Sequence, residues 1–374
     1  MPPMRLWLLL SRFESGGLER VQANLAPALA QAGLDVWLVA GQFLADAKGM
    51  SPHSIATLEI SPKGKHTFIA GLLKHLRSQR PDIVMTTSND VACLMLIFRA
   101  VFFPKIKVIC AQHLSISAPW HNARGVQRIK NRLLIGLMRY LWPKADAIIA
   151  VSSALAEDIR TTLKLRTTIH TIHNPVVLPD FEEKMQQNIL WPWPDHAVAT
   201  LGFAGRLAKV KRLDLLLDAF LQVVQTHRTR LLIVGDGPER AHVARILEQR
   251  GLRAMCHLTG HQDNPLPWIK AVDILILPSD YEGFGNVLVE ALACGTQVIA
   301  TDCPHGPAEI LENGKYGQLV PVDDSLALAQ AIERTLLKDF YVPAQTLKRR
   351  ASEFNLERAA SAYLRVILEA SIKS

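Results

Sequence analysis

Short apolar runs alternate with longer amphipathic stretches along nearly the whole chain. The runs are rich in Leu, Ile and Val, which is typical of strands buried on both faces of a sheet. Each run is followed by a loop and by a segment with apolar residues at helical spacing. This order predicts βαβ units, and therefore parallel sheets covered by helices. The strands expected in the first half are Leu6–Leu10, Val36–Val39, Ile83–Thr86, Val108–Ala111 and Ile148–Val151.

The alternation is interrupted between residues 174 and 197, where prolines gather among acidic and amide residues. This composition predicts a linker. A second series of strands follows, at Val198–Phe203, Leu231–Val234, Ile274–Leu277, Val298–Ala300 and Gln318–Val320. We therefore predict an α/β protein with two doubly wound, Rossmann-like domains, residues 1–180 and residues 181–354. The segment from about 355 to 374 has apolar residues at helical spacing, and we expect this helix to pack back on the first domain.

Composition excludes several classes of protein. The chain has 374 residues, 49% of them hydrophobic and 20% charged, which argues against a fibrous or disordered chain. Its apolar stretches, such as Val91–Phe98, are shorter than the roughly 20 residues that cross a bilayer, and Leu6–Leu10 is too short for a secretory signal. The five cysteines include no C-x-x-C pair, which argues against a disulfide scaffold or a zinc ribbon. We expect a cytoplasmic protein that does not span a membrane.

Positive charge is concentrated in the first half of the chain. The formal net charge is +8, and residues 1–180 contribute 21 of the 42 Lys and Arg but only 11 of the 34 Asp and Glu. Within this half, segment 124–144 mixes cations with apolar and aromatic residues at helical spacing. Such a helix can lie in the interfacial layer of anionic lipid, or it can pack one face into the core with its cations in water. The first alternative predicts that the basic domain contacts the cytoplasmic membrane surface.

Two loops that follow expected strands carry candidate phosphate chemistry. Gly16-Gly17 follows the first strand and opens a helix. Glycines let backbone N–H groups approach a phosphate, and the helix N-terminus adds positive potential; the alternative is a tight turn between strand and helix. Gly205-Arg206 and Lys211 follow the first strand of the second series. Two cations near one point suit a diphosphate, whereas the alternative is a solvated basic loop.

The most specific motif runs from Pro278 to Gly295, where a strand ends, a glycine-rich loop turns and a helix begins near Asn286. It contains two carboxylates, Glu282 and Glu290. A retaining glycosidase needs its carboxylates about 5 Å apart, but eight residues of helix separate them by about 12 Å. Two distinct polar contacts on one elongated ligand are therefore the better interpretation, with the helix N-terminus available to a phosphate.

These motifs, together with the turn Gly235-Asp236-Gly237-Pro238, resemble in order and spacing the motifs of the GT-B retaining glycosyltransferases of family 4. The resemblance covers nearly the whole chain. It implies the GT-B fold, in which two Rossmann-like domains face across a cleft, the first binding the acceptor and the second the nucleotide-sugar donor. The segment 302–309 departs from the plainer Gly-Gly loop of many members and resembles a bacterial envelope subgroup that handles N-acetylhexosamines or hexoses.

The resemblance also implies roles for single residues. Arg206 and Lys211 would clamp the diphosphate, Glu282 would contact the donor sugar, and Glu290 would hold the ribose hydroxyls. His113 would face the sugar across the cleft; the alternative is a histidine with hydrogen-bond partners in a loop. The remaining nucleotide-sugar contacts would come from Gly16, Gly17, Gly205, Gly283, Phe284, Gly285, Asn286 and Val287, with backbone donors from Gly17, Asn286 and Val287.

The sequence predicts glycosyl transfer without a metal or other cofactor. It contains no Asp-x-Asp, the usual metal site of the other large glycosyltransferase fold, so cations and a helix N-terminus would meet the charge on the leaving phosphate. The resemblance implies retention of configuration by same-face attack. It predicts transfer of a hexose or N-acetylhexosamine from a nucleotide-diphosphate sugar, by analogy UDP-linked. The acceptor would be a lipid-linked, lipopolysaccharide or polysaccharide hydroxyl in bacterial envelope glycan synthesis.

Three other functions stay open. Positive net charge is compatible with nucleic-acid binding, but the sequence has no RNP stretch or recognition-helix pattern and its second half is neutral to acidic. We therefore expect no nucleic-acid partner. A non-catalytic module would bind the nucleotide sugar without turnover. A GT-B epimerase or phosphorylase would use the same scaffold for different chemistry.

Overall fold

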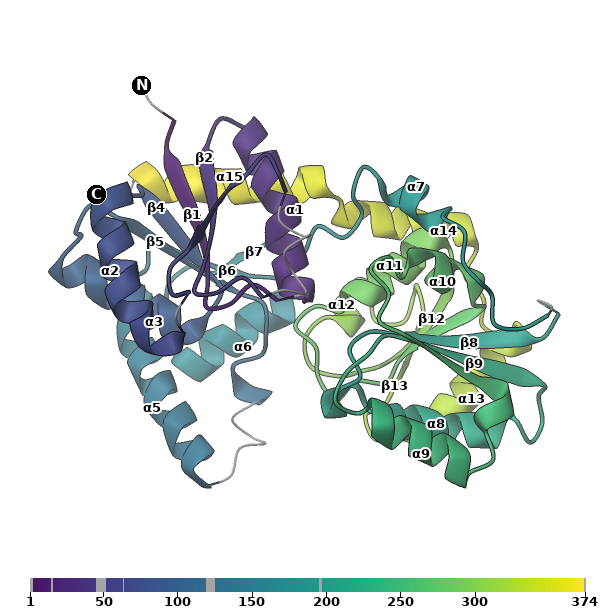
Figure 1. Ribbon diagram of the computed structural model, residues 1–374. Coiled ribbons are helices and arrows are strands. Elements are labelled where there is room, and N and C mark those ends of the chain that lie inside the picture. The colour runs from purple at the N-terminus through teal and green to yellow at the C-terminus, as the bar shows by residue number, and fades with distance from the viewer. Residues whose placement is uncertain are drawn as a thin grey trace. The chain divides into compact units, whose positions relative to one another are not determined.

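The computed structural model describes residues 3–14, 16–44, 52–62, 64–118, 125–194 and 197–372. The chain forms two compact units (Figure 1). Unit 1 comprises Met1–Pro175 with Asn355–Ser374, and unit 2 comprises Val176–Phe354. Each unit contains one parallel sheet with helices between successive strands, which confirms the predicted α/β fold.

The sheet of unit 1 has the strand order β3-β2-β1-β4-β5-β6-β7, and the pairs along it are parallel. Strands β1, β2, β4, β5 and β6 are the expected apolar runs, whereas β3 and β7 were not expected, because β3 is largely exposed and β7 has only two residues. The strands are β1 (Arg5–Leu10), β2 (Asp35–Ala40), β3 (Ala56–Glu59), β4 (Ile83–Thr86), β5 (Lys107–Gln112), β6 (Ala147–Ala150) and β7 (His170–Thr171).

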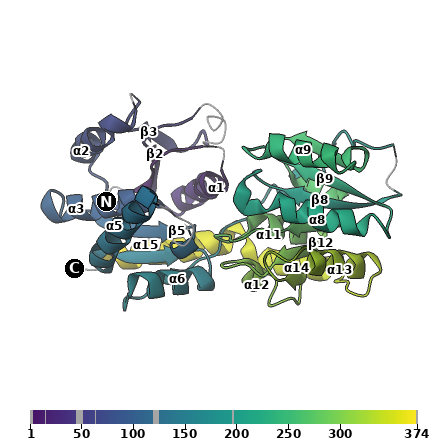
Figure 2. The same ribbon diagram turned by 90° about the horizontal axis from the view of Figure 1, so that it is seen from below.

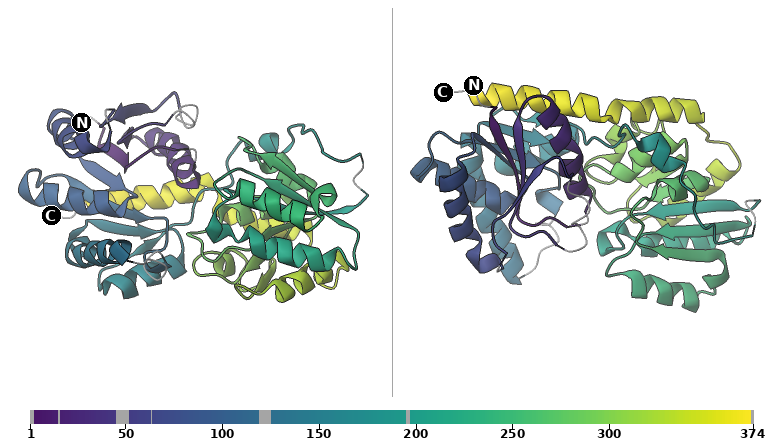
Figure 3. Two further views of the ribbon diagram at one scale, coloured as in Figure 1. Left: turned by 60° about the horizontal axis from the view of Figure 1, so that its bottom comes forward. Right: turned by 45° about the horizontal axis from the view of Figure 1, so that its top comes forward.

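Helices cover both faces of this sheet. The carboxy-terminal helix α15 packs against α1 (Figure 3). Tyr363 and Ile367 of α15 join Leu8 of β1 in one core. Helix α3 packs on β4 and β5 from the other face, and α5 packs against α3. The helices are α1 (Gly17–Gln31), α2 (Phe68–Gln79), α3 (Asn89–Val101), α5 (Gly125–Leu141), α6 (Ser153–Leu163) and α15 (Leu356–Ile372).

The sheet of unit 2 has the order β10-β9-β8-β11-β12-β13 and is also parallel. Figure 2 labels its strands β8, β9 and β12. Helices α8, α9 and α13 pack on one face, and α10, α11 and α14 lie on the other (Figure 1). The strands are β8 (Ala199–Ala204), β9 (Thr229–Val234), β10 (Cys256–Gly260), β11 (Ile274–Leu277), β12 (Gln297–Thr301) and β13 (Gln318–Val320). The helices are α7 (Phe181–Met185), α8 (Leu213–Val223), α9 (Arg240–Gln249), α10 (Leu266–Ala271), α11 (Asn286–Cys294), α12 (Pro307–Ile310), α13 (Ser325–Leu336) and α14 (Ala344–Ala351).

The proline-rich segment predicted as a linker is instead part of unit 2. Its helix α7 buries Phe181 and Met185, and Asn264 donates to the carbonyl oxygen of Lys184 at 2.8 Å. The division between the units falls at Pro175, a few residues before the predicted boundary at 180. The reason is a backbone contact within unit 2, because the N–H groups of Val176 and Val177 both donate to the carbonyl oxygen of Phe354.

The strand orders fix where ligands can bind. Each sheet reverses its winding direction between two strands, β1 and β4 in unit 1 and β8 and β11 in unit 2. The loops after such strands form a crevice at their carboxyl ends. The predicted site residues of unit 2 follow β8 and β11, and those of unit 1 follow β1 and β5. None of the helices in the described ranges combines the length and the hydropathy that a membrane crossing needs.

Candidate functional site

The loop after β8 is shaped by the glycine-rich turn after β9. Gly235 and Gly237 have positive φ angles of 131° and 157°. A Cβ at Gly235 would clash with the carbonyl oxygen of Gly205, and a Cβ at Gly237 would clash with that of Leu207. The N–H of Leu207 donates to the carbonyl oxygen of Asp236 at 2.9 Å. The two loops therefore lie backbone against backbone, which only glycine permits here.

The structure brings two predicted site residues, Lys211 and Glu282, into direct contact. Lys211 Nζ lies 2.5 Å from Glu282 Oε1, with the two side chains only 21% and 10% exposed. The same oxygen accepts a hydrogen bond from Ser279 Oγ at 2.6 Å. Ser279 is fully buried, and its carbonyl oxygen accepts from Thr301 Oγ1 at 2.6 Å. Strands β8, β11 and β12 thus supply one polar network at the switch point.

Arg206 and Arg212 flank this pair in different ways. Arg206 is exposed, next to Gly205 with its φ of 151°. Arg212 is bound by the protein itself: its guanidinium contacts Asp214 at 3.1 Å, Asp280 at 2.9 Å and Asp323 at 2.6 Å.

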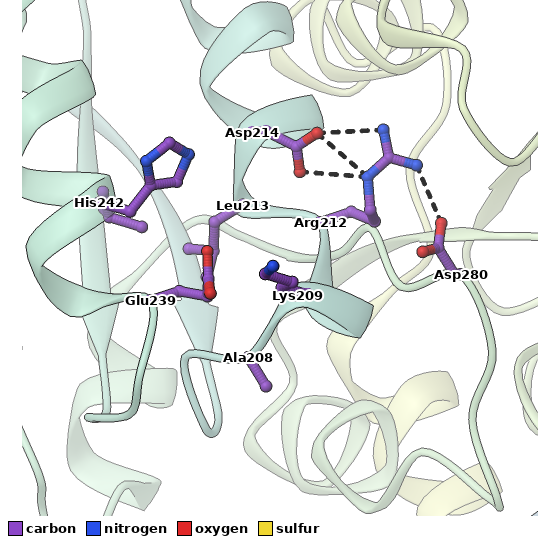
Figure 4. Close-up of a pocket in the computed structure, with 9 residues that line it drawn as sticks. Ala208, Lys209, Arg212, Leu213, Asp214, Glu239, His242 and Asp280 are labelled. Carbon is purple, nitrogen blue, oxygen red and sulfur yellow. Dashed lines mark hydrogen bonds and ion pairs between the residues drawn. The ribbon is translucent and has the colours of Figure 1, made fainter. Parts of the chain in front are cut away.

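Arg212 therefore has a structural role in the loop. Its hydrogen bonds to Asp214, and then to Asp323 and Asp280, raise the pKa of the guanidinium. Figure 4 shows Arg212 turned toward Asp214 and Asp280 beside a pocket of about 370 Å³. The structure thus ties Arg212 to carboxylates from three segments.

Helix α11 begins and ends as the motif predicts. Gly285 precedes it with φ 98° and Gly295 caps its end with φ 82°, both in the left-handed region. Glu282 lies in the loop before the helix, and Glu290 is half-buried on the helix itself. The first backbone N–H groups of a helix carry partial positive charge. An anion held near Lys211 can therefore also be stabilised by the start of α11.

The Gly16-Gly17 turn, a predicted phosphate contact, has an acidic side chain beside it. Gly16 precedes α1 in an extended conformation, and a Cβ there would clash with the carboxylate of Glu19. The Glu19 side chain thus folds over the amino end of α1, where the helix dipole favours negative charge. A phosphate at this turn would have to displace Glu19. Ser15, in the same turn, lies outside the described residues.

His113 follows β5 in unit 1 and is buried. Burial lowers the pKa of its imidazole to about 4, and the nearby Asn174 side chain opposes this shift only weakly. The ring is therefore neutral at physiological pH, and it can donate or accept a hydrogen bond without carrying charge.

The sequence analysis missed the residue that holds the loop after His113. Asp158 of α6 is buried, and its Oδ2 accepts hydrogen bonds from Ser115 Oγ at 3.1 Å, from the Ile116 N–H at 2.9 Å and from the Ser117 N–H at 3.3 Å. One carboxylate therefore fixes three consecutive residues. The available signal was an acidic residue on the apolar face of an expected helix.

Helix α5 exposes an apolar stripe. Within its described residues only Met138 and Leu141 are buried, whereas the stripe is 40–71% exposed. The helix contains no Asp or Glu, and Arg128, Lys130, Arg132 and Arg139 are exposed on it. Helix α5 therefore has one side that packs against α3 and α6, with Met138 and Leu141 buried, and a second, apolar side that is exposed; Arg124 lies outside the described residues. The stripe consists of Val126, Ile129, Leu133, Leu137 and Tyr140.

Two parallel sheets covered by helices, with cations at a switch point, form an arrangement that is typical of nucleotide-binding α/β proteins. Comparison with known families agrees with this class. Residues 198–339 match the family described as Glycosyl transferases group 1, and residues 15–178 match Glycosyltransferase Family 4. The chain belongs to the GT-B glycosyltransferases of group 1, as the sequence motifs indicated.

The names of several curated relatives contain N-acetyl amino sugars. The chain is 31% identical over 208 residues to N-acetyl-alpha-D-glucosaminyl L-malate synthase of Bacillus anthracis, covering 55% of this chain and 54% of the relative. It is 28% identical over 241 residues to a Campylobacter jejuni protein, N-acetylgalactosamine-N,N'-diacetylbacillosaminyl-diphospho-undecaprenol 4-alpha-N-acetylgalactosaminyltransferase, covering 64% of this chain and 63% of the relative. The chain thus spans about half to two thirds of these relatives. Others are named as lipopolysaccharide core glycosyltransferases.

A solved structure shows the same fold over the whole chain. Anabaena Alr3699/HepE in complex with UDP is 20% identical, with a TM-score of 0.78, and the match covers 98% of this chain and 100% of that one. Both predicted Rossmann-like domains are therefore present in the order of this fold.

Proposed function

We propose that this protein is a retaining glycosyltransferase that moves a hexose or N-acetylhexosamine from a UDP-sugar to a hydroxyl of a lipid-linked, lipopolysaccharide or polysaccharide acceptor in bacterial envelope glycan synthesis. The observation that carries this proposal is the buried contact between Lys211 and Glu282 beside the start of α11. A cation, a carboxylate and a helix N-terminus at one switch point suit a donor with a diphosphate and a sugar.

In this mechanism donor binding replaces the contact between Lys211 and Glu282. Lys211 and Arg206 neutralise the diphosphate, Glu282 turns to the sugar hydroxyls, and Glu290 holds the ribose. The bond between sugar C1 and the phosphate oxygen breaks while the acceptor oxygen bonds to C1 on the same face. The acceptor proton passes to the departing phosphate, so the products are the glycoside and UDP. The protein's cations and α11 stabilise the developing charge without a metal or other cofactor.

The relatives support the donor and acceptor classes. Anabaena Alr3699/HepE binds UDP, and the names of both curated relatives contain N-acetyl amino sugars. One of them names a diphospho-undecaprenol acceptor and the other names malate, so acceptor choice varies among relatives. In the proposal unit 1 binds the acceptor, and neutral His113 contacts the transferred sugar by a hydrogen bond.

Helix α5 supports a location at the inner face of the cytoplasmic membrane. Its exposed apolar stripe and its cations form the two faces of an interfacial amphipathic helix, which binds anionic lipid surfaces by burying apolar area and by electrostatic attraction. A lipid-linked acceptor lies at such a surface. We therefore include peripheral membrane binding through α5 in the proposal.

The test is a panel of UDP-, GDP- and ADP-sugars with candidate acceptors, measured as nucleotide release. Lys211→Ala and Glu282→Gln should each lower kcat/KM by about 100-fold, because each removes a charged contact made in the transition state. Lys209→Ala is the matched control, since Lys209 is an exposed cation of the same loop, and it should keep activity within about twofold.

The outcomes separate the alternative functions. Unaltered turnover in both variants would overturn the site assignment. UDP-sugar binding with no turnover would indicate a non-catalytic module. Conversion of the donor without an acceptor would indicate an epimerase, and dependence on inorganic phosphate a phosphorylase. Steeply salt-dependent binding to DNA or RNA would favour a nucleic-acid partner.

A further inference from the structure

A buried arginine outside every predicted motif lies near residues 282–286, between β11 and α11, which we call the donor loop. Arg350 of α14 is 8% exposed. Its Nε donates to the carbonyl oxygen of Ile310 at 3.0 Å, and its Nη2 donates to that of Glu309 at 2.7 Å. Its Nη1 pairs with Glu353 at 2.7 Å and with Glu312 at 3.1 Å. The guanidinium therefore holds the last carbonyl groups of α12 by a fork that only arginine provides.

Helix α12 in turn fixes the loop between β11 and α11. Gly306 precedes α12 with φ 119°, and a Cβ there would clash with the backbone of Phe284. Just before it, the carbonyl oxygen of Pro304 accepts a hydrogen bond from the N–H of Glu282 at 3.2 Å. A displacement of α12 would therefore be transmitted directly to Glu282 and Phe284.

A second contact path joins Arg350 to the same loop. The guanidinium carbon lies 4.9 Å from the ring centroid of Phe354. The Phe354 ring in turn lies 5.5 Å from the Phe284 ring, edge to face at 68°. Both phenylalanines are 2% exposed, so neither ring can move without disturbing packed neighbours. Phe284 immediately precedes Gly285 and the start of α11.

We propose that Arg350 is a positioning residue that sets the placement of the donor loop, residues 282–286, through α12 and through Phe354. This inference rests on the proposed function for its effect on donor binding, but its physical content is independent of it. Groups that bind a transition state must be held to about 0.5 Å, and a misplacement of about 1 Å costs up to 100-fold in rate. Arg350→Lys would keep the positive charge but lose the paired hydrogen bonds that the guanidinium donates to the carbonyl oxygens of Ile310 and Glu309.

The experiment compares Arg350→Lys and Arg350→Met with Arg349→Met, an exposed arginine of the same helix. Hydrogen exchange of the peptides covering 280–290 and 304–311 is measured on ligand-free protein, and UDP affinity is measured by calorimetry. Both Arg350 variants should exchange faster in these two peptides, and Arg350→Lys should bind UDP about tenfold more weakly. In turnover the KM for the donor should rise, whereas the KM for the acceptor should not change.

The results test the role of Arg350 and the proposed function separately. Wild-type exchange in both peptides of a folded Arg350→Lys variant would overturn the positioning role. Faster exchange in Arg349→Met as well would overturn it too, because the effect would then belong to the helix surface. If the unaltered protein binds no nucleotide, the proposed function fails while the exchange result still decides the role of Arg350. If Arg350→Met does not fold, the lysine variant gives the decision.

Discussion

Lys211 and Glu282 form an ion pair, although the family resemblance assigns Lys211 to the diphosphate of the donor and Glu282 to its sugar. The ammonium of Lys211 and the carboxylate of Glu282 neutralise each other at a largely buried position. A buried charge is costly unless it is paired. In the proposed mechanism, donor binding exchanges this contact for others, which a diphosphate offers to Lys211 and sugar hydroxyls offer to Glu282.

His113 provides a prediction at the residue scale. Its pKa is about 4 in the folded protein and about 6.5 when unfolded, so the unfolded chain takes up a proton first as the pH falls. The contribution of His113 to the free energy of unfolding should thus be complete near neutrality and fall by about 2 kcal/mol between pH 7 and pH 5. Urea unfolding of wild type and His113→Gln at both pH values measures this. An identical loss in the variant would contradict it.

At the scale of elements, two glycines with positive φ angles, Gly237 and Gly251, differ in how closely other atoms approach them. Gly237, after β9, has no room for a Cβ against Leu207, whereas Gly251, after α9, has open space. Both have positive φ angles. The φ angles are 157° at Gly237 and 67° at Gly251, so Gly237 differs from Gly251 in the close backbone contact and in a φ that L residues reach less easily.

Gly251→Ala should cost about 1 kcal/mol of unfolding free energy through strain alone. Gly237→Ala should cost about 2 kcal/mol more, because the loop after β8 must also move. Urea unfolding gives both values, and nucleotide affinity should fall only in Gly237→Ala. Equal costs in the two variants would show that the contact with Leu207 contributes nothing.

The expected elements that were found and those that were missed differ in burial. Central strands such as β1 and β11 were located because both faces are buried, which requires an unbroken apolar run. Strands β3 and β10 are at sheet edges and contain exposed or polar residues, so no such run marks them. Helix α11 was located from its glycines, since both caps need left-handed backbone.

At the scale of the whole molecule, the proposed membrane binding concerns the surface of unit 1. If α5 binds lipid as proposed, the protein should be retained at low salt by vesicles of phosphatidylethanolamine with phosphatidylglycerol, and not by phosphatidylcholine alone. Replacing Arg128 and Lys130 by Gln should weaken binding by roughly 30-fold, because each cation contributes about 1 kcal/mol at an anionic surface. Leu133→Asn should weaken it through lost apolar burial.

Ile69→Asn is the matched control, since Ile69 is an exposed apolar residue on another helix of unit 1. It should bind vesicles like the wild type. Retention that is unaffected by all three α5 substitutions would place any lipid contact elsewhere, and no retention at low salt would remove the membrane from the proposal.

The sequence by itself determined the strand series, the two α/β units, the family and the position of each motif along the chain, because burial periodicity and glycine conformations are local. Only the tertiary structure decided which partners those residues meet. It paired Lys211 with Glu282, tied Arg212 to three carboxylates, folded Glu19 over the Gly16 turn and left the α5 stripe exposed. It also joined Arg350 to the last carbonyl groups of α12. These contacts join segments far apart in sequence, and no local pattern records which distant segment a side chain will reach.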